Sequence, residues 1–435
     1  PVSLTQTMVF CYHDLMRSSS FIFSCLLSCT AILLGILFFN ASRISWIALY
    51  LLLILINLIL PIGTHHAITH HHKSKDPIDA WISTISLLYA IFLILFPRLF
   101  EPFLFLLCGL WMAFEAFISF IDFLVITHDG TAGAGSRMTA ALFSLILSFL
   151  MIFGKTIHLK TSVLSLAAGI FFLIWGIRSL ILTITRRNPY GFLAAHTHWS
   201  LSVPLLAGAL MPISAYISIH SLQHSSTADL PIPSDDDSLH VYIYLHGTGF
   251  EMFGHIDIAY KGMIYSYGCH DPRHRTLMGT LGDGVLIRAD EKNFIRHAIN
   301  NDDSTIISYG IALSDFQKTV LQERIHTMMA RTVSWHCAYE TDHSAADYVS
   351  RVYKSTGCEL YKFTSGKFRT YFVASTNCVL LADELIRSKQ LHLVTPGGFI
   401  TPGAYLAFLN DAWQRKEGNV KERKIYATAN RSYHD

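Results

Sequence analysis

The sequence predicts a helical membrane bundle followed by a soluble α+β domain. Of the 435 residues, 51% are hydrophobic and only 15% are charged, whereas a soluble domain usually carries about a quarter charged residues. The deficit is confined to one half of the chain. Residues 18–222 consist mostly of apolar runs, and residues 223–435 have an ordinary globular composition. Two regions that face different solvents account for this contrast.

Seven apolar segments in the first half are candidates for crossing a bilayer, which takes about 20 mainly apolar residues per helix. They are approximately residues 20–40, 44–63, 80–97, 103–127, 139–155, 162–185 and 199–220. The fifth segment is short and the seventh contains two prolines, Pro204 and Pro212. The sequence therefore predicts six or seven spans within a transmembrane domain of residues 1–222.

The basic residues of the connecting loops predict the orientation of the bundle. With a cytoplasmic N-terminus, the inner loops carry Arg17, Lys73, Lys75, Arg137, Arg186 and Arg187. The outer loops then carry Arg43, Arg98, Lys155 and Lys160. Because positive residues gather on the cytoplasmic side, this orientation is favoured. Seven spans would place the C-terminal domain on the outer side, and six would reverse that placement.

Small residues recur within the paired apolar helices of residues 141–187, which end in the phrase GIFFLIWGIRSLI at 169–181. This pattern resembles the HdeD-like family of small bacterial membrane proteins over about residues 80–187. The resemblance implies a helical membrane bundle and names no chemistry. Gly169 and Gly176 are expected to let neighbouring helices approach closely.

Charged and histidine-rich stretches of the first half suggest structural roles. Arg178 lies inside a span, where we expect it to snorkel or to pair with Glu115 or Asp122. The stretches HHAITHHHK (65–73) and AHTHW (195–199) could ligate a metal, but membrane di-iron enzymes use several separated histidine boxes. We expect solvated interfacial loops and no metal or cofactor. Basic residues are scattered along the chain, which indicates no nucleic-acid partner.

The second half begins with a polar, proline-broken and acidic linker at residues 223–239. The soluble domain is expected at 240–413, followed by a polar tail at 414–435 of mixed charge. Its predicted strands are HVYIYLHG at 240–247, then GHIDIAYKG and MIYSYG joined by a tight turn at Lys261-Gly262, and FRTYFVAS. Its predicted helices cover 291–300, 314–333, 346–357 and the run CVLLADELIRSK from Cys378, with Thr376 or Asn377 as the N-cap.

Two residues of this domain suggest covalent chemistry. Cys378 is expected in the first turn of a helix, where unpaired N–H groups and the positive dipole end favour the thiolate form of a cysteine. His255 follows Gly254 in a strand of apolar residues, where an imidazole without a partner would be costly. A cysteine activated by a histidine is the usual arrangement for acyl transfer through a thioester.

The order of these motifs carries a second resemblance. FGH at 253–255, IYSYG at 264–268 and TNC at 376–378 resemble a bacterial envelope family of unknown function in the circularly permuted branch of the NlpC-type papain-like fold. The resemblance covers about residues 240–410 and implies a Cys–His thiol enzyme. Its relatives cleave peptide or peptidoglycan amides, hydrolyse or transfer lipid acyl groups, or N-acylate lipoproteins.

The third catalytic group is less well marked. Ser266 stands where this family pattern has an asparagine, so we place Tyr267 third, with Ser266 and His270 as alternatives. The pair His336-Cys337 is a rival nucleophile site, but it lacks a helix-start signature. The backbone N–H of Cys378 is a candidate donor to an oxyanion.

The sequence thus predicts a membrane-anchored cysteine hydrolase or acyltransferase that uses Cys378, His255 and Tyr267 without a cofactor. A membrane tether favours a membrane-associated lipid, lipoprotein or peptide substrate. The two resemblances imply a multi-pass protein of the bacterial inner membrane, and the loop charges with seven spans place the soluble domain on the periplasmic side. The alternative is a membrane protein whose papain-like domain binds a partner without catalysis.

Overall fold

The structure of this chain is a computed structural model that describes thirteen stretches of it. They are residues 25–26, 28–39, 47, 50–51, 54–55, 77–154, 156–159, 161–187, 238–245, 254–302, 304–386, 402–414 and 419–426. The chain divides into two compact units, Pro1–Phe120 with Ser136–Leu193, and Ile121–Gly135 with Ala194–Asp435. The expected linker lies almost entirely outside the described residues, so the predicted domain limits around it stay predictions.

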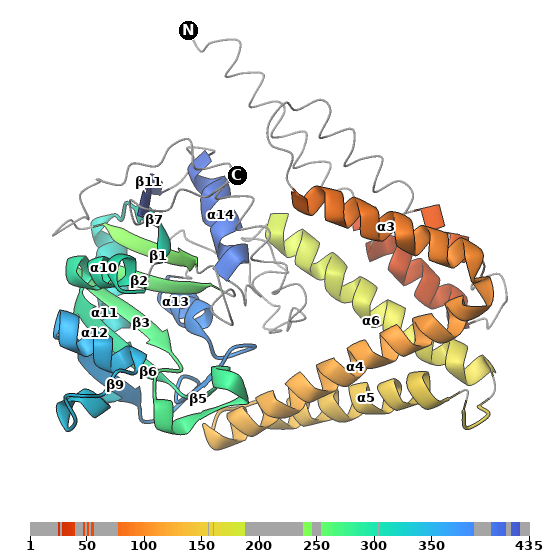
Figure 1. Ribbon diagram of the computed structural model, residues 1–435, viewed down its shortest axis with the longest axis horizontal. Helices are drawn as coiled ribbons and strands as arrows, with labels where there is room; N and C mark the ends of the chain where they lie inside the picture. Colours follow the sequence, from red (N-terminus) through yellow and green to blue (C-terminus); the bar gives the residue numbers. More distant parts are fainter. Residues whose placement is uncertain are drawn as a thin grey trace, which may run out of the picture. The chain divides into compact units, whose positions relative to one another are not determined.

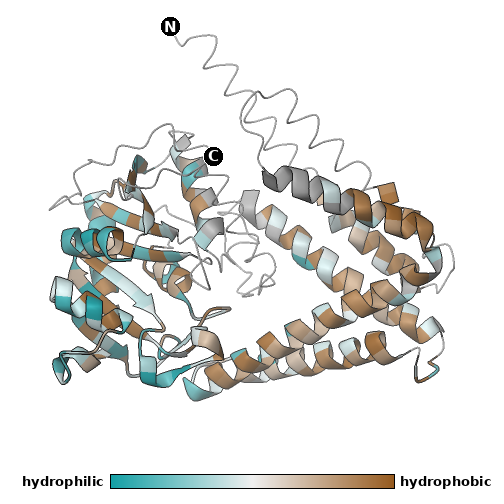
Figure 2. Cartoon of the chain, in the orientation of Figure 1, coloured by the Kyte–Doolittle hydropathy of each residue, from teal (hydrophilic) through white to brown (hydrophobic). Residues whose placement is uncertain are grey.

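The first half contains long apolar helices. They are α3 (Pro77–Leu95), α4 (Pro97–His128), α5 (Ala134–Phe153) and α6 (Thr161–Arg187). Within the described residues, three stretches are long and apolar enough to cross a membrane: Pro102–His128, Ala134–Phe153 and Ser162–Ile181. Their hydrophobic colouring is evident in Figure 2. They match three of the expected spans, whereas the span expected at 199–220 and most of that at 44–63 lie outside the described residues.

The helices of the first unit pack through small residues, as expected for membrane helices. A Cβ atom added to Gly169 would lie 2.9 Å from the Gly35 carbonyl oxygen, and one added to Gly176 would lie 2.9 Å from the Ser28 carbonyl oxygen. α6 therefore approaches the short apolar helix Ser28–Phe39 closely. Arg178 forms an ion pair with Glu115, one of the two partners that the sequence suggested.

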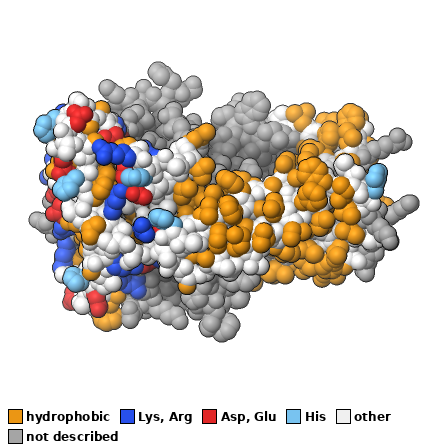
Figure 3. All heavy atoms as spheres, turned by 90° about the horizontal axis from the view of Figure 1, so that it is seen from below, with side chains coloured by type: hydrophobic (Ala, Val, Ile, Leu, Met, Phe, Trp, Pro, Cys, Tyr) orange, Lys and Arg blue, Asp and Glu red, His pale blue; other side chains and the backbone are white. Residues whose placement is uncertain are grey.

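The outer faces of these helices remain apolar. Large hydrophobic residues exposed on α4 and α5 include Leu106, Leu110, Phe117, Phe143 and Ile146. Figure 3 shows such side chains gathered over the helices, while charged side chains gather over the second unit. A surface of this kind is unfavourable in water and suits a lipid environment.

The second unit is built on an antiparallel eight-stranded sheet (Figure 1). Its order is β11-β7-β1-β2-β3-β6-β9-β8. These strands are β1 (Leu239–Leu245), β2 (His255–Tyr260), β3 (Met263–Gly268), β6 (Val285–Asp290), β7 (Thr305–Ile311), β8 (Thr332–Ser334), β9 (Glu359–Phe363) and β11 (Val420–Tyr426). The predicted turn between β2 and β3 is confirmed: Lys261 and Gly262 both have positive φ angles, 52° and 70°, as a tight hairpin requires.

Helices cover both faces of this sheet. One core contains side chains of α10 (Glu291–Asn300) and α12 (Tyr348–Thr356). The opposite core contains side chains of α11 (Asp315–Met329), α13 (Cys378–Ile386) and α14 (Pro402–Gln414). The helices predicted at 291–300 and 346–357 thus exist, and the second ends at Gly357 in the left-handed conformation (φ 63°). The helix predicted at 314–333 ends earlier, at Met329, and Thr332–Ser334 form β8 instead. The chain combines apolar helices with an antiparallel sheet domain, and the papain-like topology stays a prediction.

A second, small sheet has the order β10-β5-β4. It contains β4 (Arg275–Thr276), β5 (Leu281–Asp283) and β10 (Thr370–Phe372), with the short helical turns η3 (Pro272–His274) and η4 (Leu277–Gly279) beside β4. β10 leads directly to the segment that precedes α13. This sheet therefore joins the segment between β3 and β6 to the segment that precedes Cys378.

Gly284 lies where this small sheet meets β6, and its replacement by alanine should destabilise the second unit. A Cβ atom there would lie 2.4 Å from the Tyr267 hydroxyl and 2.5 Å from the Phe368 carbonyl oxygen. We expect a loss of about 1–3 kcal/mol, the usual effect of overpacking a core, measured by thermal unfolding of the full chain in detergent. Gly135→Ala is the control, because nothing lies within 4 Å of an added Cβ there. An equal effect of both substitutions would contradict the packing described.

Candidate active site

Cys378 is the first residue of α13. The amide of Leu380 donates to Oδ1 of Asn377 at 3.0 Å, so Asn377 is the N-cap, one of the two residues predicted. The side-chain nitrogen Nδ2 of Asn377 donates to the Val373 carbonyl at 2.8 Å. The thiol therefore stands at the end of the helix where backbone N–H groups lack helical partners and the dipole is positive.

The segment before Cys378 is held by a series of hydrogen bonds. The Thr376 hydroxyl donates to the Thr370 carbonyl at 2.8 Å and accepts from the Phe372 amide at 3.0 Å. The Val373 amide donates to the Thr280 carbonyl at 2.9 Å. Because Thr376 and Asn377 are also buried, the chain segment that leads to Cys378 is held in place.

His255 begins β2 and is anchored by two polar side chains. Its Nε2 lies 2.7 Å from Oδ1 of Asp257 and 3.0 Å from Oγ of Ser266. The Asp257 side chain is fully buried, while that of His255 is 23% exposed. Gly254 precedes the histidine with a φ of 73°, a conformation that glycine adopts readily. The imidazole is thus fixed through one nitrogen and remains partly open to solvent.

His255 and Cys378 interact, although they belong to opposite faces of the sheet. Asp257 shares a face of β2 with Ala259, which contributes to the core under α10 and α12, because side chains alternate along a strand. Cys378 contributes to the other core, and α13 packs on β2. The thiol nevertheless acts on the imidazole by its charge and by hydrogen bonding. The structure brings together the two residues that the sequence singled out.

The pKa of His255 lies well above its ordinary value. Burial alone would lower the pKa of this imidazole, but the negative charge of Asp257 and the thiol of Cys378 outweigh that effect. The positively charged imidazolium is therefore favoured near neutral pH. An imidazolium at this position can donate a proton during acyl transfer.

The candidates for the third catalytic group, Tyr267, Ser266 and His270, occupy different places. The Tyr267 hydroxyl donates to the Phe368 carbonyl at 2.9 Å, and its ring packs against Phe363, Phe368 and Tyr371. A catalytic role for Tyr267 stays a prediction. Among the groups weighed from the sequence, Ser266 is the one that bonds His255. Asp257 was missed, although the pattern His-Ile-Asp places it on the same face of a strand as His255.

His270 lies beside His255 without bonding it in the described structure. Its ring centre is 6.4 Å from that of His255 and 4.9 Å from that of Tyr348. Burial, and then the positive charges of His255 and Arg275, lower the pKa of His270 well below its ordinary value. The ring folds back over Gly268, where an added Cβ would lie 2.3 Å from Nε2. The glycine of the IYSYG motif is therefore required for space.

The other cysteines of the second unit have the character of packing residues. Cys337, the rival nucleophile, is 2% exposed and belongs to the core under α10 and α12. Burial raises the pKa of its thiol. Burial likewise raises the pKa of Cys269 and of Cys358, each to about 11. His336, next to Cys337, is engaged by Glu340 at 2.6 Å.

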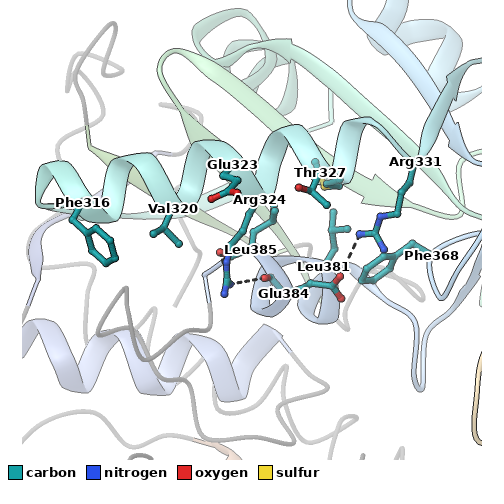
Figure 4. Close-up of a pocket in the computed structure, with 11 residues that line it drawn as sticks. Phe316, Val320, Glu323, Arg324, Thr327, Arg331, Phe368, Leu381, Glu384 and Leu385 are labelled. Carbon is teal, nitrogen blue, oxygen red and sulfur yellow. Dashed lines mark hydrogen bonds and ion pairs between the residues drawn. The ribbon is translucent and has the colours of Figure 1, made fainter.

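A pocket of about 520 Å³ lies between α11 and α13 (Figure 4). α13 contributes Leu381, Glu384 and Leu385, all on the C-terminal side of Cys378, which does not itself line the pocket. The lining is mixed: Arg331 pairs with Glu384, and apolar side chains lie on either side of that pair. This pocket offers space beside α13.

One cluster of metal-ligand type occurs among the described residues, formed by Asp271, His274 and Asp283. Nζ of Lys362 lies 2.6 Å from Asp271 and 2.7 Å from Asp283. The ammonium group thus occupies the position of a cation between the two carboxylates. The histidine-rich stretches 65–73 and 195–199 lie outside the described residues.

Comparisons with protein-family models, curated proteins and solved structures find nothing that matches this chain.

The raised pKa of His255 predicts a specific dependence of stability on pH. A group whose pKa rises on folding stabilises the fold fully below its unfolded value, about 6.5 for histidine, and this contribution disappears as the pH rises through the folded-state pKa. His255→Gln should therefore lower the melting temperature of the full chain most at acidic pH and least at alkaline pH. The control is the same substitution in an Asp257→Asn background, where the pH dependence should be much weaker. A deficit that grows with pH would contradict the pairing.

Proposed function

We propose that this chain is a membrane-anchored, cysteine-dependent acyl-transfer enzyme. The observation that carries the proposal is the anchored imidazole of His255, which is held by buried Asp257 and whose pKa is raised in part by the thiol that opens α13. The proposal includes a circularly permuted papain-like domain and a bundle of six or seven spans. It also places the chain in a bacterial inner membrane with its soluble domain on the outer side.

The reaction begins with attack of the Cys378 sulfur on an acyl carbonyl. The imidazolium of His255 donates its proton to the departing oxygen or nitrogen, and a thioester forms between the sulfur and the acyl carbon. A second acceptor, which is water in a hydrolase or an alcohol or amine in a transferase, then attacks the thioester. His255 takes the proton of that acceptor, and the Cys378 thiolate leaves.

The surrounding groups support both half-reactions. Asp257 holds the ring of His255 and stabilises its positive charge, the role that the sequence had assigned to Tyr267. The N–H groups at the start of α13, including that of Cys378, stabilise negative charge on the carbonyl oxygen. A carboxylate that is fully buried suits this task, because its interaction with the imidazolium is weakly screened.

The long apolar helices favour a substrate that also resides at the membrane. A lipid, a lipoprotein or a peptidoglycan-type amide would each present an acyl carbonyl to the anchored domain. Hydrolysis and transfer share the acyl-enzyme intermediate, so the same residues serve either outcome. The apolar side chains in the mixed lining of the pocket along α13 would suit part of an acyl chain.

The proposal predicts that Cys378 is the site of acylation. The full chain in detergent is treated with an acyl-type thiol probe, and the labelled residue is located by peptide mass spectrometry. Cys378→Ala should abolish labelling, and His255→Gln should slow it by about 100-fold or more, the usual contribution of a general acid–base group. Cys358→Ala is the matched control and should label normally. Retained labelling in Cys378→Ala, with loss in Cys337→Ala, would contradict the proposal.

A further inference from the structure

The turn η4 exposes two adjacent apolar side chains at its tip. Leu277 is 44% exposed and Met278 is 82% exposed. Both have positive φ angles, 47° and 58°, a conformation that is unfavourable for residues with long side chains. Strain and exposure therefore coincide at the tip, and strained backbone often marks a functional contact.

Basic residues surround this tip. Arg273 and Arg275 precede it and are exposed, and Arg369 is exposed on the neighbouring approach to β10. The nearby carboxylates of Asp271 and Asp283 are both bonded by the ammonium group of Lys362. The tip thus combines an apolar end with a positively charged base, the pattern of a segment that enters the headgroup region of an anionic membrane.

The tip is connected to the small sheet, and Thr370 of that sheet bonds the residue that follows α4. η4 connects β4 to β5, and β5 pairs with β10. In β10, the Thr370 hydroxyl donates to Asp129 at 2.6 Å and its amide donates to Asp129 at 3.2 Å. Asp129 immediately follows the apolar stretch Pro102–His128 and belongs to the second unit.

We propose that the tip formed by Leu277 and Met278 inserts into the surface of a lipid bilayer that contains anionic phospholipid. Arg273 and its basic neighbours contact the phosphate groups of the lipids. Two independent features support this partner: the amphipathic tip itself, and its sheet, which is bonded to the residue after a helix long and apolar enough to span a membrane. The Thr280–Val373 hydrogen bond then keeps the approach to Cys378 beside the inserted tip.

The test uses the full chain in vesicles that contain a phospholipid with a photoactivatable group in its acyl chain. After irradiation and tryptic digestion, the fragment Thr276–Arg288 contains the tip, and the fragment Thr332–Arg351 contains Val333, a control that is 53% exposed elsewhere in the same unit. We expect severalfold more lipid on the tip fragment than on the control fragment. Leu277→Ser with Met278→Ser should remove that excess.

Two further variants separate this inference from the chemistry. Arg273→Gln should reduce labelling of the tip in phosphatidylglycerol vesicles and leave it unchanged in phosphatidylcholine vesicles. Cys378→Ala should label like the unaltered chain, so a failure of the proposed enzyme activity would not affect the result. Equal labelling of the two fragments would overturn the inference.

Discussion

The buried carboxylate of Asp257 is the constraint on which the proposed site depends. A charge without solvent is strongly unfavourable unless a partner of opposite charge and hydrogen bonds compensate it. His255 supplies that partner at 2.7 Å, and Ser266 adds a hydrogen bond to the same ring nitrogen. The carboxylate consequently holds the imidazole in one orientation and raises its pKa. The pairing with the thiol at the start of α13 follows from this arrangement.

The surrounding fold fixes the position of Cys378, which belongs to the core on the other face of the sheet. α13 packs on β2, and Asn377 caps the helix, so Cys378 has a fixed position. The residues before it are bonded to β10 and to the turn near Thr280. The small sheet therefore connects three features: the segment before Cys378, the exposed tip at Leu277 and Met278, and the contact with Asp129. Only a few hydrogen bonds separate the tip and the Asp129 contact from the segment before Cys378.

Local signals in the sequence sufficed for several parts of this arrangement. The N-cap at Asn377, the hairpin turn at Lys261-Gly262 and the glycine stop at Gly357 all depend on residues within a few positions of one another. The carboxylate that holds His255 was missed because the motif IYSYG indicated Tyr267 as the third group, whereas its hydroxyl bonds the Phe368 carbonyl. The Asp129–Thr370 contact joins residues 241 positions apart. No pattern within a window of sequence predicts such a contact.

The most direct test of the central claim is the rate at which iodoacetamide alkylates Cys378 as a function of pH. The tryptic fragment Thr370–Arg387 reports this residue alone in the full chain. A Cys–His pair predicts that His255→Gln and Asp257→Asn each slow the alkylation of Cys378 severalfold near neutral pH. Equal alkylation rates in all three proteins would contradict the account.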